Sequence, residues 1–398
     1  IDGDNGGTWA QLKNAVETAV DNKEIIIKGR IKAAHGDEEI KVSKQITIKP
    51  QSGSPIIDAD KANQGANVHR IFRVVSGASL TLKNIDLRNG KAATGGTSDV
   101  TETNTKGGAI YVESGATLTM ENGRIGDCTA AHYGGAIANL GTLNLSGVSF
   151  ESNEALAFSG GAIYNDGSGS IQAVGCIFGG SDTWGNKAHK DGGAIAVNGS
   201  SAGEIKIKYG TISHNEAKNG KGGGIYSGSA ITIEGTGSSR SEISSNKAKE
   251  NGGGIYTSAR LDITYLNNND NTANGNGGGI YADAGSVCTI KNSTMSRNTS
   301  TGSGGGLHVS DKTTTVTQAA KCKLDSTEMK GNKAKSVGGG AIYSAGTLEI
   351  ISCTLGNVSV GNDSNSADGT GFVYGGAVYI FGGSCKLKDT TVQNNKIV

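Results

Sequence analysis

The sequence is poor in proline, in aromatic residues and in net charge. Its 398 residues include 2 prolines against 65 glycines, and only 5% are aromatic. Glycine with abundant proline is typical of collagen or of disorder, whereas regularly spaced glycine without proline favours tight turns between short hydrogen-bonded strands. With 37 basic and 36 acidic residues, the formal net charge is +1. This balance gives no electrostatic reason for a nucleic-acid partner, and we expect none.

Long apolar runs and paired-cysteine motifs are also missing from the sequence. A membrane-spanning helix needs about 18 or more apolar residues in a row, so we expect no direct membrane insertion by this chain. The six cysteines form no Cys-x-x-Cys pair and no metal-ligand spacing, and we expect no cofactor and no metal. Cys288 and Cys322 fall on adjacent repeats, so a disulfide between them stays open beside the interpretation of both as small core residues.

A short glycine motif, Gly-Gly-(Ala/Gly)-(Ile/Leu/Val), recurs through the chain at intervals of 25 to 36 residues. Its copies begin at Gly107, Gly134, Gly160, Gly192, Gly222, Gly252, Gly277, Gly304, Gly339 and Gly375. Self-similarity at this period predicts a solenoid. The first copy is followed by three strand-like stretches, at 109–112, 117–120 and near Ile125. We therefore predict an all-β chain, a right-handed parallel β-helix of about thirteen coils.

The beginning of the chain lacks the glycine motif and carries a helical pattern instead. Trp9, Leu12, Val16 and Val20 lie at helical spacing after Thr8, a suitable N-cap. We predict a helix over 8–20 that covers the open first coil, because an uncovered solenoid end exposes its core and a strand edge. The predicted domain is continuous, with a cap over 1–21, first coils and an exposed loop over 22–106, and glycine-motif coils over 107–398.

A second motif, Asn-x-Ala, stands six or seven residues before most glycine motifs. Asparagine at one coil position can form a ladder of side-chain hydrogen bonds along the stack, and asparagine tolerates the left-handed backbone of a tight turn. A ligand-binding role for these residues is the alternative. The predicted ladder consists of Asn153, Asn186, Asn215, Asn246, Asn271, Asn298 and Asn332, the sixth of which is followed by Thr299-Ser300.

The two motifs together resemble the polymorphic outer membrane protein (Pmp) repeats of chlamydia-like and spirochaetal surface proteins, which carry GGA(I/L/V) and FxxN. The chain has GGAI at Gly107 and four further copies, GGAV at Gly375, and a strict FxxN at Phe150–Asn153. Four glycine motifs read GGG, and elsewhere the Phe is replaced, as by Ile in Ile212–Asn215. The resemblance implies a right-handed β-helix, export to the bacterial surface, and an adhesin or autotransporter passenger with a role in virulence.

The residue after the glycine motif is most often tyrosine. Strand alternation places it on the face opposite the preceding aliphatic residue, so inward aliphatic residues predict an outward column of aromatic rings. Such a column can bind sugars or a protein partner, or it can be a self-stacking ladder that protects the sheet. The candidate residues on neighbouring coils are Tyr226, Tyr256, Tyr281, His308 and Tyr343.

Residues for catalysis or calcium binding do not stand out. The stretches 267–271 and 362–369 are rich in Asn and Asp, whose oxygens calcium accepts, but neither has the spacing of a calcium loop, and we interpret both as solvated turns. Many polysaccharide lyases and hydrolases share this fold and need carboxylates grouped on neighbouring coils. Here the aspartates recur at no single coil position and the six histidines are scattered. We expect no catalytic residue and no enzyme.

The sequence thus predicts an adhesin-like β-helix that attaches to a host-cell protein or glycan receptor, with 91–106 and 356–372 as binding or antigenic loops. A polysaccharide lyase or glycoside hydrolase is the alternative, and a structural stalk or surface-layer component is the second alternative. We expect a monomer that is extracellular or held at the outer membrane by a segment outside this chain. The chain opens at Ile1 without a signal peptide and stops at Val398 within a repeat, so we expect a fragment.

Overall fold

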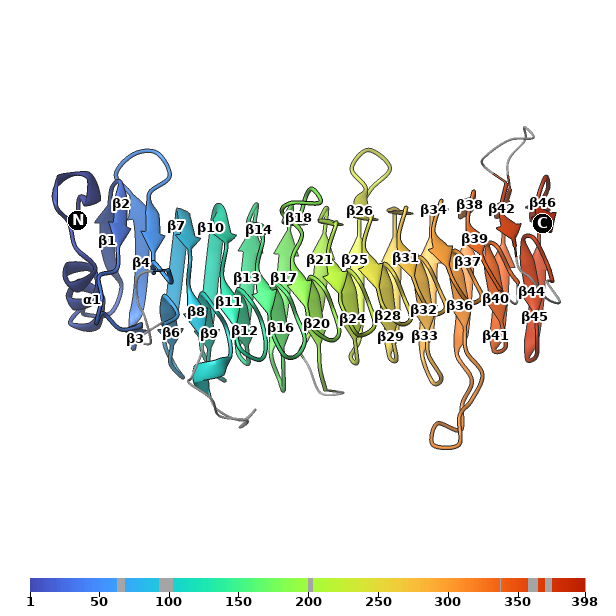
Figure 1. Cartoon of the computed structure of the whole chain (residues 1–398), viewed down its shortest axis with the longest axis horizontal. Coiled ribbons are helices and arrows are strands. Elements are labelled where there is room, and N and C mark those ends of the chain that lie inside the picture. The colour runs from blue at the N-terminus through green and yellow to red at the C-terminus, as the bar shows by residue number, and fades with distance from the viewer. Residues whose placement is uncertain are drawn as a thin grey trace. The chain divides into compact units, whose positions relative to one another are not determined.

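The computed structural model describes residues 1–62, 69–92, 103–199, 203–336, 338–356, 364–368 and 374–397. The chain is divided into two compact units, and Figure 1 labels their helices and strands. Unit 1 comprises Ile1–His189 with Ala194–Ile205, and unit 2 comprises Lys190–Gly193 with Lys206–Val398. Each unit is a parallel β-helix, which confirms the predicted fold class. The predicted division of one continuous domain into 1–21, 22–106 and 107–398 stays a prediction.

The coils contribute strands to three parallel sheets, one of which begins only at β8 (Lys91–Ala92) among the described residues. We call them the glycine-motif sheet, whose strands begin at the aliphatic residue of that motif, the alanine sheet, built from two-residue strands after the ladder asparagines, and the long sheet. Equivalent residues of successive coils lie in register, as Ile255 does with Ile280 and Tyr256 with Tyr281. Inward aliphatic residues therefore stack on one another and form the core of each unit.

Unit 1 contains strands of all three sheets and two short helices, η1 (Gly3–Asn5) and η2 (Thr103–Thr105). Its glycine-motif strands are β3 (Ile40–Val42), β6 (Phe72–Val74), β9 (Ile110–Val112), β12 (Ile137–Asn139), β16 (Ile163–Asn165) and β20 (Ile195–Val197). Its alanine-sheet strands are β8 (Lys91–Ala92), β11 (Thr129–Ala130), β15 (Glu154–Ala155) and β19 (Lys187–Ala188). Its long-sheet strands are β1 (Lys23–Ile27), β2 (Arg30–Lys32), β4 (Gln45–Pro50), β5 (Ile56–Asp58), β7 (Ser79–Arg88), β10 (Thr117–Gly126), β13 (Thr142–Ser146), β14 (Ser149–Glu151), β17 (Ser170–Val174) and β18 (Ile177–Gly179).

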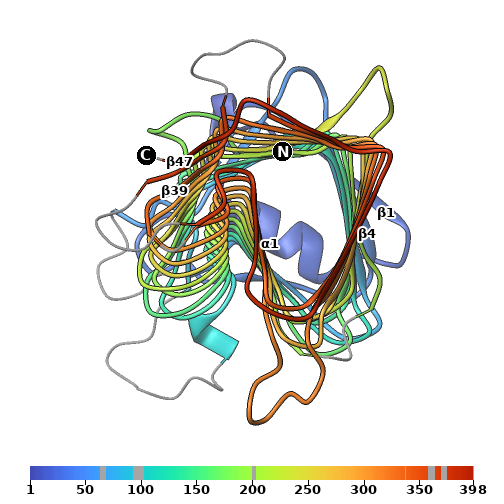
Figure 2. The same ribbon diagram turned by 90° about the vertical axis from the view of Figure 1, so that its right-hand side faces the viewer.

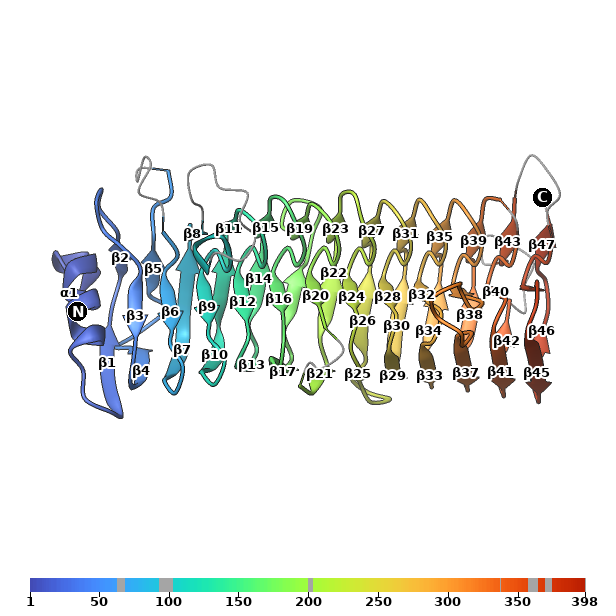
Figure 3. The ribbon, with the colours of Figure 1, turned by 90° about the horizontal axis from the view of Figure 1, so that it is seen from below.

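Unit 2 repeats the same three sheets, and strand β21 (Ile205–Lys208) contains the boundary between the units. Its glycine-motif strands are β24 (Ile225–Ser227), β28 (Ile255–Thr257), β32 (Ile280–Ala282), β36 (Leu307–Val309), β40 (Ile342–Ser344) and β44 (Val378–Ile380). Its alanine-sheet strands, whose stacking is clear in Figure 3, are β23 (Glu216–Ala217), β27 (Lys247–Ala248), β31 (Thr272–Ala273), β35 (Thr299–Ser300), β39 (Lys333–Ala334), β43 (Ser366–Ala367) and β47 (Lys396–Ile397). Its long-sheet strands are β22 (Thr211–Ser213), β25 (Ile231–Glu234), β26 (Ser241–Ser244), β29 (Arg260–Thr264), β30 (Leu266–Asn269), β33 (Val287–Lys291), β34 (Thr294–Ser296), β37 (Lys321–Asp325), β38 (Glu328–Lys330), β41 (Thr347–Ile351), β42 (Thr354–Leu355), β45 (Ser384–Lys388) and β46 (Thr391–Val392).

The two leading glycines of the motif serve different geometric needs. In the copy at Gly252, the first glycine has φ 71°, a left-handed conformation that side chains disfavour. The second, Gly253, packs so closely on the next coil that an added Cβ would lie 2.4 Å from the Gly278 carbonyl oxygen. The aliphatic residue that ends the motif, Ile255, is fully buried. The motif thus turns the chain tightly and lets the coils approach before the next strand begins.

The N-terminal helix α1 (Trp9–Glu17) packs on β3 and lies across the first coil of unit 1 (Figure 2). A capping box starts it, since the Gln11 N–H donates to Thr8 Oγ1 and the Thr8 N–H donates to Gln11 Oε1. The buried face holds Trp9, Leu12 and Val16, and the Trp9 indole N–H donates to the Glu38 carbonyl at 2.9 Å. The helix ends at Glu17, so the prediction of a helix extending to Val20 is wrong: Val20 is 72% exposed and adds no buried contact.

Deletion of residues 1–21 should expose the core side chains and strand edges that α1 covers, and the shortened chain should aggregate. Size-exclusion chromatography with light scattering measures this directly. The matched point variants are Trp9→Ala, which should lower the free energy of unfolding by about 3–5 kcal/mol, and the exposed Asn14→Ala, which should change it little. A monomeric deletion variant with an unchanged melting temperature would contradict the role of α1 as a cap.

Candidate functional site

The predicted asparagine ladder is present in both units. In unit 1, Asn153 Nδ2 donates to Asn186 Oδ1 at 2.9 Å. In unit 2, equivalent bonds of 2.9 to 3.0 Å join successive residues from Asn215 to Asn395. The members of the unit 2 ladder are Asn215, Asn246, Asn271, Asn298, Asn332, Asn365 and Asn395. The hydrogen bonds confirm a structural ladder, and a ligand-binding role of these asparagines stays a prediction.

Each buried ladder amide uses both its nitrogen and its oxygen. Asn298, for example, donates to Asn332 Oδ1 at 3.0 Å and to the Asn268 carbonyl at 2.8 Å. Its own Oδ1 accepts from the backbone N–H and the Nδ2 of Asn271, both at 3.0 Å. Because a buried polar group without a partner is costly, these four bonds make the side chain a structural element of the coil.

The ladder asparagines do not themselves take the left-handed backbone that asparagine tolerates. At most ladder positions the positive φ belongs to the preceding residue, with 56° at Ser245, 58° at Asp270 and 55° at Arg297. The physical reason is that the corner must be turned before the asparagine side chain enters the core. At position 128 a cysteine replaces the ladder asparagine, and its backbone N–H donates to Asn153 Oδ1 at 3.1 Å.

Two ladder members, Asn365 and Asn395, were not predicted from the sequence. The signal was present for the first, since Asn365-Ser366-Ala367 fits the Asn-x-Ala motif, but it lay within the acidic stretch 362–369 that we interpreted as a solvated turn. That interpretation is wrong for the described part, 364–368, because Asn365 is fully buried in the ladder.

The stretch 267–271 is also not a solvated turn. Asn267, Asn268 and Asn269 belong to β30, and Asp270 at the following corner pairs with Arg297, with both oxygens at 2.8 Å from guanidinium nitrogens. Asn268 lies in register between the core residues Ile243 and Met295, and it is fully buried. In the described ranges, no group of three or more His, Cys, Asp or Glu side chains is arranged to hold a metal ion.

The aromatic candidates of unit 2 form one continuous stack. Ring centroids are 5.2 Å apart for Tyr226–Tyr256, 5.3 Å for Tyr256–Tyr281, 4.7 Å for Tyr281–His308 and 4.6 Å for His308–Tyr343, and neighbouring planes are within 11° of parallel. These spacings match the separation of stacked strands. The stack agrees with the self-stacking interpretation, and a role in ligand binding stays a prediction.

The expectation that this stack is exposed is wrong. Tyr256 is 3% exposed, and Tyr281, His308 and Tyr343 are each less than 10% exposed. The aromatic side chains point away from the aliphatic core, as predicted. The segment that precedes each glycine motif, however, covers this side of the glycine-motif sheet. There, Lys221 Nζ lies 4.6 Å from the Tyr256 ring centroid. The Tyr256 hydroxyl donates to the Asp283 carboxylate.

Burial changes the protonation of the stack. It lowers the pKa of His308 to about 3, although a hydrogen bond with the Ser303 backbone opposes the shift. Burial also raises the pKa values of Tyr226, Tyr256 and Tyr281, and the Asp283 carboxylate raises that of Tyr256 further. The rings are therefore neutral at physiological pH, and the histidine packs as an uncharged aromatic side chain.

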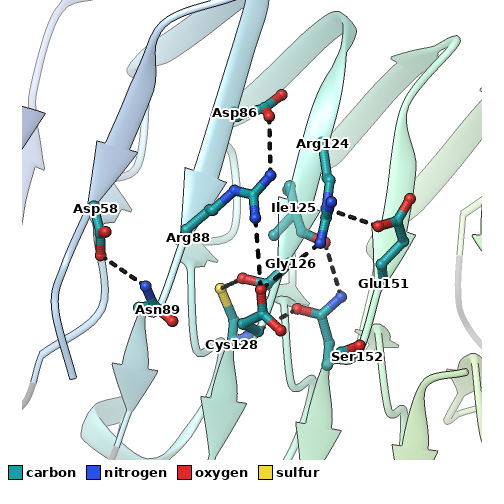
Figure 4. A network of polar contacts seen from close by, with 12 residues as sticks. Asp58, Asp86, Arg88, Asn89, Arg124, Ile125, Gly126, Cys128, Glu151 and Ser152 are labelled. Atoms are coloured by element: carbon teal, nitrogen blue, oxygen red, sulfur yellow. Dashed lines mark hydrogen bonds and ion pairs between the residues drawn. The ribbon is translucent and has the colours of Figure 1, made fainter. Parts of the chain in front are cut away.

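Unit 1 carries a network of charged side chains on the outward face of the long sheet (Figure 4). Arg88 contacts Asp86 at 3.5 Å and Asp127 at 3.9 Å, and Arg124 contacts Glu151 at 2.8 Å and Asp127 at 3.7 Å. One coil earlier, the buried Asp58 pairs with Arg30 and accepts from Asn89 Nδ2 at 3.0 Å. Each of these carboxylates has an arginine partner, so the cluster is an ion-pair network rather than a pair of opposed carboxylates suited to hydrolysis.

The cysteines are buried or half-buried free thiols. Cys288 and Cys322 lie in register on β33 and β37, and the pKa of Cys322 is raised by the neighbouring Cys288 thiol and by burial. Burial also raises the pKa of Cys128 to about 12. Thiols with raised pKa values are weak nucleophiles, which favours the interpretation of these residues as core side chains.

The predicted binding loops fall largely outside the described residues. Of 91–106, Lys91 and Ala92 form β8 and Thr103–Thr105 form η2, while 93–102 are not described. Of 356–372, only Gly356 and 364–368 are described. Their predicted role in binding therefore stays a prediction.

Replacement of one ladder asparagine should strongly destabilise unit 2. Asn298→Ala removes four hydrogen bonds and takes the side-chain acceptor from the buried backbone N–H of Asn271, so we expect a loss of about 3–5 kcal/mol in the free energy of unfolding. The matched control is Asn267→Ala on the outward face of β30, with an expected change below about 0.5 kcal/mol. Urea unfolding followed by circular dichroism compares them, and equal losses would contradict the ladder's structural role.

His308 should make the folded chain sensitive to acid. Its pKa is lower in the folded state, so the stability that it contributes is complete above the unfolded pKa of about 6.5 and is lost as pH falls toward about 3. Between pH 7 and pH 5, the wild-type chain should lose roughly 2 kcal/mol more than His308→Tyr, which continues the tyrosine stack. Denaturant unfolding at each pH tests this, and parallel curves for the two proteins would refute it.

Comparisons with known proteins agree with the repeat pattern. Residues 240–258, which contain Ile243-x-x-Asn246 and the glycine motif at Gly252, match the Chlamydia polymorphic membrane protein repeat. No curated protein matches the sequence. A solved structure of a PL6 family polysaccharide lyase from Pseudopedobacter saltans is similar over 98% of this chain and 91% of that chain, at 12% identity and a TM-score of 0.34. Nothing about the activity of this chain follows from a similarity at that level.

Among the described residues, no helix is both long and apolar enough to cross a lipid bilayer. The repeat that residues 240–258 match thus lies in a parallel β-helix whose core is formed by stacked aliphatic residues and a buried asparagine ladder. The chain carries a repeat of the Chlamydia polymorphic membrane protein type at residues 240–258.

Proposed function

We propose that the chain is an adhesin-like β-helix displayed at the bacterial surface, where it attaches to host cells, matrix proteins or glycans without catalysis. The observation that carries this proposal is the contrast between inward and outward positions in the long sheet of unit 2. One inward column reads Ile233, Ile263, Ile290, Leu324 and Ile350, and the adjacent outward column reads Thr232, Asp262, Thr289, Lys323 and Glu349. A constant core with a varied surface suits a scaffold that presents side chains for binding.

Two further observations support a role in attachment to a host surface rather than in catalysis. The carboxylates of the charged network in unit 1, such as Asp86 and Glu151, are paired with arginines and do not form an opposed acidic pair. The repeat at 240–258 belongs to a family named for a membrane protein of Chlamydia, and this name supports a location at the bacterial surface. The partner is then a host-cell protein or glycan receptor.

The proposal is tested by measuring the binding of the purified 398-residue chain to cultured host cells, immobilised matrix proteins and a panel of polysaccharides. Each reaction is also assayed for new reducing ends and for unsaturated sugars. We expect saturable binding to at least one surface and no product. Cleavage of any polysaccharide would contradict the proposal in favour of a lyase or hydrolase, and the absence of all binding would favour a structural stalk.

A further inference from the structure

A shallow groove of about 160 Å³ lies on the outward face of the alanine sheet in unit 2. It crosses three neighbouring coils, at β23, β27 and β31, and is lined by Glu216, Ala217, Lys218, Lys247, Ala248, Lys249, Thr272 and Asn274. The alanines of these strands are buried, with exposed fractions of 4% or less. Strand alternation therefore directs their polar neighbours into solvent, and the groove combines an alanine floor with polar walls.

The lining of the groove carries three lysines against one carboxylate, so its charge is positive. Lys218, Lys247 and Lys249 are all exposed, and Glu216 is the only carboxylate in the lining. Among the described residues, neither Lys247 nor Lys249 forms an ion pair. Lysines elsewhere in unit 2 are often neutralised, as Lys323 and Lys386 are by Glu349 at 3.2 and 3.3 Å.

The spacing of the lysines favours an extended ligand. Glu216 and Lys247 are register partners, so Lys218 and Lys249, each two residues further on, lie on adjacent coils about 5 Å apart. Lys247 in β27 and Lys249 just after it are separated by about 7 Å along the extended chain. Like charges at adjacent strand positions repel each other, and a ligand with several negative groups relieves this repulsion at more than one point.

The neutral side chains of the groove indicate which anion fits. Thr272 offers a hydroxyl and Asn274 an amide on the coil next to the lysines, and both can bond to sugar hydroxyls. Lysine ammonium groups bind anionic groups as point charges without a fixed orientation. No aromatic ring lines the groove for stacking nucleic-acid bases, and its alanine floor has no pocket for the side chains of a peptide.

We propose that this groove binds an acidic saccharide, a glycan chain bearing sulfate or carboxylate groups. This inference rests on the proposed function, because it names the ligand class through which the chain would attach to a host surface. The lysines would hold the anionic groups, and Thr272 and Asn274 would bond to hydroxyl groups of the same chain.

The test measures binding of the full chain to a heparin oligosaccharide by biolayer interferometry. Lys247→Ala/Lys249→Ala should weaken binding about tenfold or more, equivalent to about 1.4 kcal/mol. The matched control, Lys291→Ala/Lys321→Ala, removes the same charge from exposed positions on β33 and β37, and should change binding less than about twofold. Glu216→Gln should tighten binding, because it removes the one negative charge in the groove. Binding should fall when NaCl is raised from about 50 mM to about 500 mM.

The outcomes separate this inference from the proposed function. If both double variants weaken heparin binding equally, the groove is not the binding site, and the positive charge of the whole surface accounts for the binding. Binding to host cells without binding to heparin would overturn the inference and leave the adhesin proposal standing. Binding to polyglutamate or single-stranded DNA as tight as to heparin would also overturn it, since the site would then not be a saccharide site. A chain that binds no cell, no matrix protein and no polysaccharide, heparin included, would end both proposals.

Discussion

The hydrogen bond from one ladder asparagine to the next is the interaction on which the coils depend. It runs along the stacking direction, and in unit 2 it continues unbroken from Asn215 to Asn395. Each amide is fully satisfied inside the core, where an unpaired group would cost about 1–3 kcal/mol. Hydrogen bonds in series also polarise one another. The ladder therefore fixes the corner of the coils that it joins, and the residue before most of its asparagines takes the left-handed backbone that the corner requires.

The ladder and the glycine motif leave the outward positions free to vary. Inside, the ladder coils of unit 2 carry an asparagine, two glycines and an aliphatic residue at set positions, as at Asn246 and Gly252–Ile255. Outside, the same framework carries the arginine–carboxylate network around Arg124 in unit 1 and the lysine groove around Lys247 in unit 2. Because the outward side chains contribute little to stacking, they can differ from coil to coil without loss of the fold, which is the property that a binding scaffold needs.

The sequence predicts the fold well because the residues that each coil requires recur at a regular interval. The strand expected at 109–112 is β9, and those expected at 117–120 and near Ile125 are joined in β10. The burial of the tyrosine stack could not be predicted, because it depends on the path of the chain before each glycine motif, which has no period. The strand in 267–271 cannot be predicted from the local sequence, because a run of asparagines is typical of a turn. Asn268 nevertheless occupies a buried position at which neighbouring coils carry an aliphatic residue or methionine. The lysine groove draws its residues from three coils, and no local motif marks it.

Hydrogen exchange of the intact chain, followed by mass spectrometry, tests the central role of the ladder most directly. Backbone N–H groups of Asn246, Asn271 and Asn298 donate to the side-chain oxygen of the next ladder residue. Peptides that contain them should exchange as slowly as the buried glycine-motif strands and should lose protection only when unit 2 unfolds as a whole. If they exchange as fast as the exposed loop at 311–318, the ladder does not hold the coils together and this account of the structure is wrong.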